Sequence, residues 1–163
     1  MVGFESIYVE HFRGVYRYVY TLCHDEILAE EITQEAFFKA LESLDKFDGK
    51  CHLFVWLCQI AKNTYFSYLK RKKIQSEHSA SNYLSFSTDS LEDKITDQDT
   101  AQNIHRLIHT LKDPYKEVFL LRVYAELSFA HIGKIFDKSD SWARLVYYRA
   151  KNELRRKWDE NTL

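Results

Sequence analysis

Residues 127–156 of the 163-residue chain read LSFAHIGKIFDKSDSWARLVYYRAKNELRR. Apolar residues recur at helical spacing in residues 129–136 and again from residue 140 onward, and Ser128 suits the N-cap of the first of these helices. The stretch Asp137-Lys138-Ser139 between them predicts a tight turn. Two helices joined by a turn of about three or four residues, the second rich in cations, form a helix-turn-helix. The sequence therefore predicts this motif near its C-terminus.

The same helical spacing continues toward the N-terminus. It predicts helices over residues 4–20, 26–44, 53–73, 104–111 and 115–124, with His24-Asp25 as the break between the first two. The chain has 4 glycines and 1 proline, too few turn residues for the many short strands of a sandwich or barrel. The glycines also lie too far apart to form a phosphate-binding loop. The predicted fold is all-α, and nucleotide-binding folds of that kind are excluded.

Charge divides the chain into three parts. Residues 1–73 carry 10 basic and 10 acidic side chains, residues 74–103 carry 1 and 6, and residues 104–163 carry 12 and 8. A cationic part beside an acidic, serine-rich stretch is typical of a nucleic-acid-binding domain and its tether. We therefore expect two small helical domains, residues 1–73 and 104–163, joined by a flexible linker over residues 74–103.

The second predicted helix has an acidic face that carries an aromatic side chain. Its inward positions by spacing are Leu28, Ile32, Ala36, Ala40 and Leu41, and its other face consists of Glu30, Glu31, Gln34, Glu35, Phe38 and Glu42. An exposed aromatic ring among charges favours a surface that a partner covers. Spacing alone fits an ordinary solvated face equally well.

The third predicted helix ends in a run of cations interleaved with aromatic residues. The cations are Lys62, Lys70, Arg71, Lys72 and Lys73, and the rings are Tyr65, Phe66 and Tyr68. Cations bind phosphates, and rings offer faces on which unpaired bases stack, so this pattern suits single-stranded or opened nucleic acid. The alternative is a helix C-terminus that complements its own dipole, with the rings in the core.

The remaining chemistry-bearing residues do not indicate a catalytic or metal site. Three cysteines without a secretory leader predict a reducing cytoplasm and no disulfide framework, and the absence of a long apolar run predicts no membrane insertion. The pairs Cys23-His24 and Cys51-His52, with Cys58, match no zinc spacing, so we expect packing roles, no metal and no cofactor. The seven histidines form no defensible catalytic pattern, so we expect neither enzyme activity nor a small-molecule substrate.

Three motifs in order carry a family resemblance. They are AEEITQEAFFKAL at residues 29–41, KFDGKCHLFVWLCQIAKNTYFSYLKRKK at residues 46–73, and LKDPYKEVFLLRVYAELSFAHIGKIFDKSDSWARLVYYRAKNELRR at residues 111–156. Together they resemble regions 2 and 4 of bacterial sigma factors of the extracytoplasmic-function (ECF) group in the sigma-70 family. A helix-turn-helix alone is weak evidence, but all three motifs in family order around a linker are specific.

The resemblance implies a factor that directs core RNA polymerase to promoter DNA and that an anti-sigma protein, often membrane-anchored, holds inactive. It assigns binding to the clamp helices of the largest polymerase subunit to Glu30, Glu31, Gln34, Glu35 and Phe38. It assigns capture and melting of the −10 element to Phe47, Asp48, Gly49, Lys50, Lys62, Asn63, Tyr65, Lys70 and Arg71. It assigns −35 recognition to Ser139, Ser141, Arg144, Tyr148, Arg149 and Lys151.

The chain also departs from the family pattern. Arg144-Leu145-Val146 stands where a Lys/Arg-Ser-Arg run is usual, Asp137 stands where a turn glycine is common, and Trp142 replaces a small residue. The alternative function is a helix-turn-helix repressor or response-regulator output protein. Such a protein would form a dimer and would lack both the acidic docking face and the basic-aromatic third helix.

Overall fold

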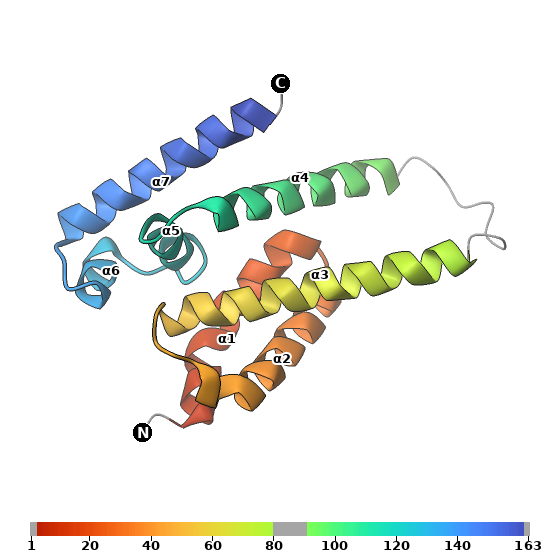
Figure 1. The fold of residues 1–163 in the computed structure, drawn as a ribbon, viewed down its shortest axis with the longest axis horizontal. Coiled ribbons are helices and arrows are strands. Elements are labelled where there is room, and N and C mark those ends of the chain that lie inside the picture. Colours follow the sequence, from red (N-terminus) through yellow and green to blue (C-terminus); the bar gives the residue numbers. More distant parts are fainter. Residues whose placement is uncertain (1–2, 80–90, 162–163) are drawn as a thin grey trace.

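The computed structural model describes residues 3–79 and 91–161, and in these residues it contains α-helices, one short 3-10 helix and no strand (Figure 1). The elements are α1 (Phe4–Cys23), α2 (Glu26–Ser43), η1 (Leu44–Lys46), α3 (Leu53–Ser79), α4 (Leu91–Thr110), α5 (Tyr115–Val123), α6 (Phe129–Ile135) and α7 (Asp140–Asn161). The predicted all-α class is confirmed.

Local chemistry explains the break between α1 and α2. His24 adopts a left-handed conformation (φ 52°), and its backbone N–H closes α1 by donating to the Tyr20 carbonyl. Asp25 then caps α2, because its Oδ1 accepts a hydrogen bond from the Leu28 backbone N–H at 3.0 Å. Such a cap contributes about 1 kcal/mol. The predicted interruption at these two residues is confirmed.

Helices α1, α2 and α3 pack together as the N-terminal lobe. Its fully buried centre includes Val15, Tyr18, Ala29, Phe37 and Leu57. Full burial of each large side chain is worth about 1.5–3 kcal/mol. One predicted inward position is wrong: Leu41 is exposed, and Phe37 fills the core instead.

Helices α4 to α7 form the C-terminal lobe, in which α6 and α7 make the predicted helix-turn-helix (Figure 1). Ser128 caps α6 by accepting a hydrogen bond from the His131 N–H at 3.2 Å. The turn is tight, since a Cβ on Gly133 would lie 2.7 Å from the carbonyl oxygens of Lys138 and Ser139. Asp137 takes the left-handed conformation (φ 58°) that glycine or Asp tolerates best.

The two lobes contact each other along a seam between α1 and α4 and between α3 and α5. Thr21 Oγ1 lies 2.9 Å from His105 Nε2, and the Tyr18 hydroxyl lies 2.6 Å from His109 Nε2. The backbone N–H of His52 donates to Glu117 Oε1 at 2.6 Å. Buried residues of both lobes form one apolar cluster. Periodicity, which describes each helix by itself, gives no sign of this pairing.

The linker prediction needs correction. Residues 74–79 continue α3, and residues 91–103 form the first part of α4, where the sequence predicted a flexible stretch. These stretches of sequence are mostly polar and have no sustained apolar period from which a helix could be predicted. The rest of the predicted linker, residues 80–90, lies outside the described residues.

Candidate polymerase and nucleic-acid interface

Helix α2 presents an exposed stripe with apolar side chains at both ends and acids between them. Phe38 is 61% exposed although it is a large ring. Residues at spacings of about three and four share one helix face, so the stripe runs along the helix axis. It consists of Ile27, Glu30, Glu31, Gln34, Phe38 and Leu41. Ile27 (74% exposed) and Leu41 were not among the predicted site residues. They could have been included because they share a helix face with Phe38.

Some polar side chains of this stripe, and the neighbouring Glu35, form hydrogen bonds or ion pairs within the protein. Gln34 Nε2 donates to Glu30 Oε1 at 3.3 Å. Glu35, which is half-buried, pairs with Lys39 at 3.2 Å, and Lys39 also donates to Thr64 Oγ1 on α3. Glu35 is therefore tied to the lobe, whereas Glu31 and Phe38 project outward.

The loop of residues 47–50 is held by its own polar atoms. Asp48 Oδ1 accepts from the Lys50 backbone N–H at 3.1 Å, and Lys50 Nζ lies 3.3 Å from Asp48 Oδ2. The Lys50 N–H lowers the pKa of Asp48. Gly49 between them has φ +72°, a conformation that favours glycine. Phe47 is half-buried against Trp56, with ring centroids 5.0 Å apart.

The predicted cations of α3 lie in two different environments. Asn63, Lys70 and Arg71 are exposed. Lys62 is half-buried, and its pKa is lowered by burial and by Lys116 of the opposite lobe. Lys62 thus lies at the seam, while the others face away from the core.

The predicted role of Tyr65 needs correction. Tyr65 is 1% exposed and stacks within the lobe beside Phe66 and Tyr68, with centroid distances of 5.9 and 6.5 Å. Burial raises its pKa to about 12. A ring with both faces covered cannot stack on a base, so Tyr65 belongs to the core, which is the alternative that the pattern left open.

The start of α7 is capped by Ser139, one of the two serines predicted to bind phosphate. Ser139 Oγ accepts a hydrogen bond from the Trp142 N–H at 3.1 Å, and the Ser141 N–H donates to Asp140 Oδ1 at 2.9 Å. Both serines remain exposed. The ring of Trp142, which replaces a small residue, packs against Phe136 with centroids 5.3 Å apart.

The −35 candidates on α7 all face outward. Arg144, Arg149 and Lys151 are exposed, and Tyr148 is half exposed. The Arg144 guanidinium lies 5.4 Å from the ring centroid of Phe129 on α6, at cation–π distance. Arg122 lies over the same ring at 4.2 Å.

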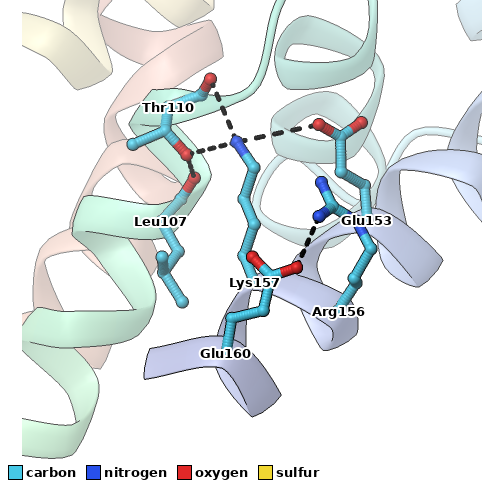
Figure 2. A network of polar contacts seen from close by, with 6 residues as sticks. All are labelled: Leu107, Thr110, Glu153, Arg156, Lys157 and Glu160. Carbon is cyan, nitrogen blue, oxygen red and sulfur yellow. Dashed lines mark hydrogen bonds and ion pairs between the residues drawn. The ribbon is translucent and has the colours of Figure 1, made fainter. Parts of the chain in front are cut away.

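The cations at the end of α7 are already engaged within the protein (Figure 2). Lys157 Nζ donates to Thr110 Oγ1 at 2.8 Å and lies 3.7 Å from Glu153, which anchors α7 to α4. Arg156 pairs with Glu160 at 2.7 Å. Arg156 and Lys157 are therefore engaged within the protein, whereas Arg144, Arg149, Lys151 and Arg155 are exposed.

The cysteines lie in apolar surroundings. Cys23 and Cys58 are buried, Cys51 is half-buried, and burial raises the pKa of Cys58 well above its ordinary value. Residues 3–79 and 91–161 contain no cluster of three or more His, Cys, Asp or Glu side chains that could hold a metal ion. None of the described helices is both long and apolar enough to cross a bilayer.

Comparison of the sequence with known proteins finds similarity to RNA polymerase sigma factors. The sequence model described as Sigma-70 region 2 matches residues 7–74. The chain is 28% identical over 155 residues to the RNA polymerase sigma factor YlaC of Bacillus subtilis, covering 93% of this chain and 90% of that protein. It is 24% identical over 151 residues to the ECF RNA polymerase sigma factor SigM of the same organism, covering 93% and 92%. It is 27% identical over 134 residues to the ECF RNA polymerase sigma-E factor of Escherichia coli, covering 76% and 70%.

Among solved structures, the chain is similar to the sigma factor RpoE of Bartonella quintana, crystallised with the anti-sigma factor NepR. The identity is 17%, the TM-score is 0.47, and 94% of each chain is covered.

The family match spans α2, the 47–50 loop and nearly all of α3, and the two Bacillus relatives extend over both lobes. Residues 7–74 therefore match Sigma-70 region 2, and over both lobes the chain is similar to extracytoplasmic-function RNA polymerase sigma factors.

Proposed function

We propose that this sigma factor binds core RNA polymerase through the α2 stripe and places two DNA-reading surfaces on promoter DNA. The observation that carries the proposal is the presence, on one chain, of an exposed acidic and apolar face on α2 and an exposed cationic helix-turn-helix. A protein that only binds DNA needs the cationic helix-turn-helix but has no use for the acidic and apolar face on α2.

The α2 stripe has the composition of a protein-binding surface. Phe38 offers a large apolar area near the C-terminal end of the stripe, and aromatic anchors of this kind contribute most to binding when water is excluded around them. The neighbouring carboxylates steer and orient a cationic partner more than they add affinity. A basic helical surface on the largest polymerase subunit, its clamp helices, is the partner that we propose.

The exposed loop and the exposed side of α3 support capture of the −10 element. Extruding a base costs a few kcal/mol, which the amide of Asn63 and the loop can recover through the base's hydrogen-bonding edge. Lys70 and Arg71 lie on the same helix and supply phosphate contacts. We propose that the −35 element is bound by α7, through Arg144, Tyr148, Arg149 and Lys151, with phosphate at Ser139 and Ser141.

We also propose an anti-sigma protein as a regulatory partner, which would act by covering the α2 stripe or α7. If that protein is anchored in a membrane, the factor is held there until release and otherwise acts in the cytoplasm. The role is one of binding and strand opening, while RNA synthesis is the chemistry of the polymerase.

The function is tested by run-off transcription with purified core polymerase on a library of genomic promoter fragments. A sigma factor makes core polymerase start at defined positions. The alternative, a helix-turn-helix repressor, would bind duplex DNA alone and would not redirect initiation, and that result would refute the proposal.

Replacing Phe38 by alanine should weaken binding to core polymerase by about tenfold or more, because the exposed aromatic anchor of the stripe is removed. The measurement is competition between labelled wild type and unlabelled variant for core enzyme. Val9→Ala is the matched control, because Val9 is 75% exposed on α1 and outside the stripe. Equal affinity of Phe38→Ala and wild type would show that the stripe is not the docking face.

A further inference from the structure

The orientation of α7 separates a buried side from an outward side. Ala143, Val146 and Ala150 are buried, so they mark the inward direction of the helix. A helix turns by about 100° per residue, which places the opposite side along one line of residues. That outward line is Ser141, Leu145, Tyr148 and Asn152.

Leu145 is therefore an apolar side chain at the centre of the outward side, 49% exposed. Its flanks are cationic, since Arg144 lies on one side of the line and Arg149 on the other, and both are exposed. Arg144 is drawn toward α6, with its guanidinium 5.4 Å from the Phe129 ring. The arginines are thus placed to reach the two phosphate backbones that border a groove, with Leu145 between them.

A leucine in the middle of a groove meets the edges of bases. In the major groove only thymine presents an apolar group, its C5-methyl, while the other bases present hydrogen-bonding atoms. Covering a polar edge with leucine would cost the desolvation of a group left without a partner. The most favourable base opposite Leu145 is therefore thymine.

We propose that Leu145 is a specificity-determining residue that reads a thymine of the −35 element by contact with its methyl group. The inference rests on the proposed function, in which α7 lies in the major groove. It also explains the departure from the usual Lys/Arg-Ser-Arg run. The third position of that run, Val146, is turned into the core, and the second presents a hydrocarbon side chain instead of a hydroxyl.

The test uses holoenzyme made from the full chain and core polymerase. A promoter is first selected from a pool in which the −35 region is randomised. Each thymine of the selected −35 region is then replaced, one at a time, by deoxyuridine, which removes only the methyl group. We expect one position at which this change lowers promoter binding about fourfold, the value of one buried methyl group.

The decisive comparison is with Leu145→Ala. In that variant the loss caused by deoxyuridine should disappear at this position, while it should persist in the control Val123→Ala, an exposed apolar residue of α5. Because Leu145 is half exposed, the variant should fold, and its thermal unfolding is compared with that of wild type. Leu145→Ser provides a second variant with the same expected result.

The possible results distinguish a failure of the proposed role of Leu145 from a failure of the proposed sigma function. If wild-type holoenzyme initiates from selected promoters but no thymine is sensitive, or if the sensitivity persists in Leu145→Ala, the role of Leu145 is refuted and the sigma function stands. If wild-type protein supports no promoter-specific initiation, both are refuted.

Discussion

Lowering the pH from 7 to 5 should reduce the free energy of unfolding by about 4 kcal/mol, because the seam between the lobes contains histidines that the fold keeps neutral. The pKa of both His105 and His109 is lowered to about 3, chiefly by burial. His109 contributes to the lowering at His105, and Lys62 and Lys116 contribute to it at His109. In the unfolded chain their pKa is about 6.5. Between about pH 6.5 and pH 3 the unfolded state therefore binds more protons, and stability falls as the pH falls.

Among the residues that the structure describes, no acid acts on these histidines to stabilise a positive charge. The groups that face them are Tyr18, Thr21, Lys62, Lys116 and Tyr124, from α1, α3, α5 and the residue that follows α5. His105 is 2% exposed, and its Nδ1 has no hydrogen-bond partner among the described residues. A proton on His105 would therefore create an unpaired buried charge.

The measurement is urea unfolding at a series of pH values between 5 and 8. The double variant His105→Gln, His109→Gln should be less stable at pH 7 and should lose most of the pH dependence. His131→Gln, which changes an exposed histidine, should leave the dependence unchanged. A wild-type stability that is constant over this range would contradict the seam described above.

Replacing Gly133 by alanine should destabilise the C-terminal lobe by about 3 kcal/mol and weaken −35 binding at the same time. The added Cβ would lie 2.7 Å from two backbone carbonyl oxygens, those of Lys138 and Ser139. Backbone at a tight turn cannot move aside as a flexible side chain can, so the turn must open. Opening the turn changes the angle between α6 and α7.

Thermal unfolding and promoter binding by the holoenzyme measure the two effects of Gly133→Ala. Gly3→Ala is the control, because no atom lies within 4 Å of the position of its Cβ. Wild-type stability in Gly133→Ala would mean that the turn is looser than the structure describes.

The features that could be predicted from the sequence are those encoded locally. The break at His24-Asp25 and the cap at Ser128 follow from side chains that act within one turn of their own helix. The exposure of Phe38 could be predicted because its neighbours on the same face are charged.

The features that could not be predicted depend on how the helices pack. Spacing along α3 left Tyr65 either a core role or a DNA-facing role, and the packing of that helix against its neighbours decides for the core. The pairing of Tyr18 with His109 joins residues 91 positions apart, which no periodicity records. Leu145 could have been noticed as an apolar residue in a cationic run, but its outward direction needed the buried positions of α7.

The extension of α3 to Ser79 and the early start of α4 at Leu91 have a consequence for reach. Twelve peptide links join these two helix ends, and fully drawn out they span about 43 Å. Two DNA elements one and a half duplex turns apart are separated by about 50 Å. The covalent tether alone falls short of that spacing. The remaining length must come from the lobes themselves, because the proposed reading surfaces lie on the 47–50 loop, α3 and α7 and not at the ends of the tether. The distance between these surfaces therefore depends on how the lobes are oriented as well as on the length of the tether.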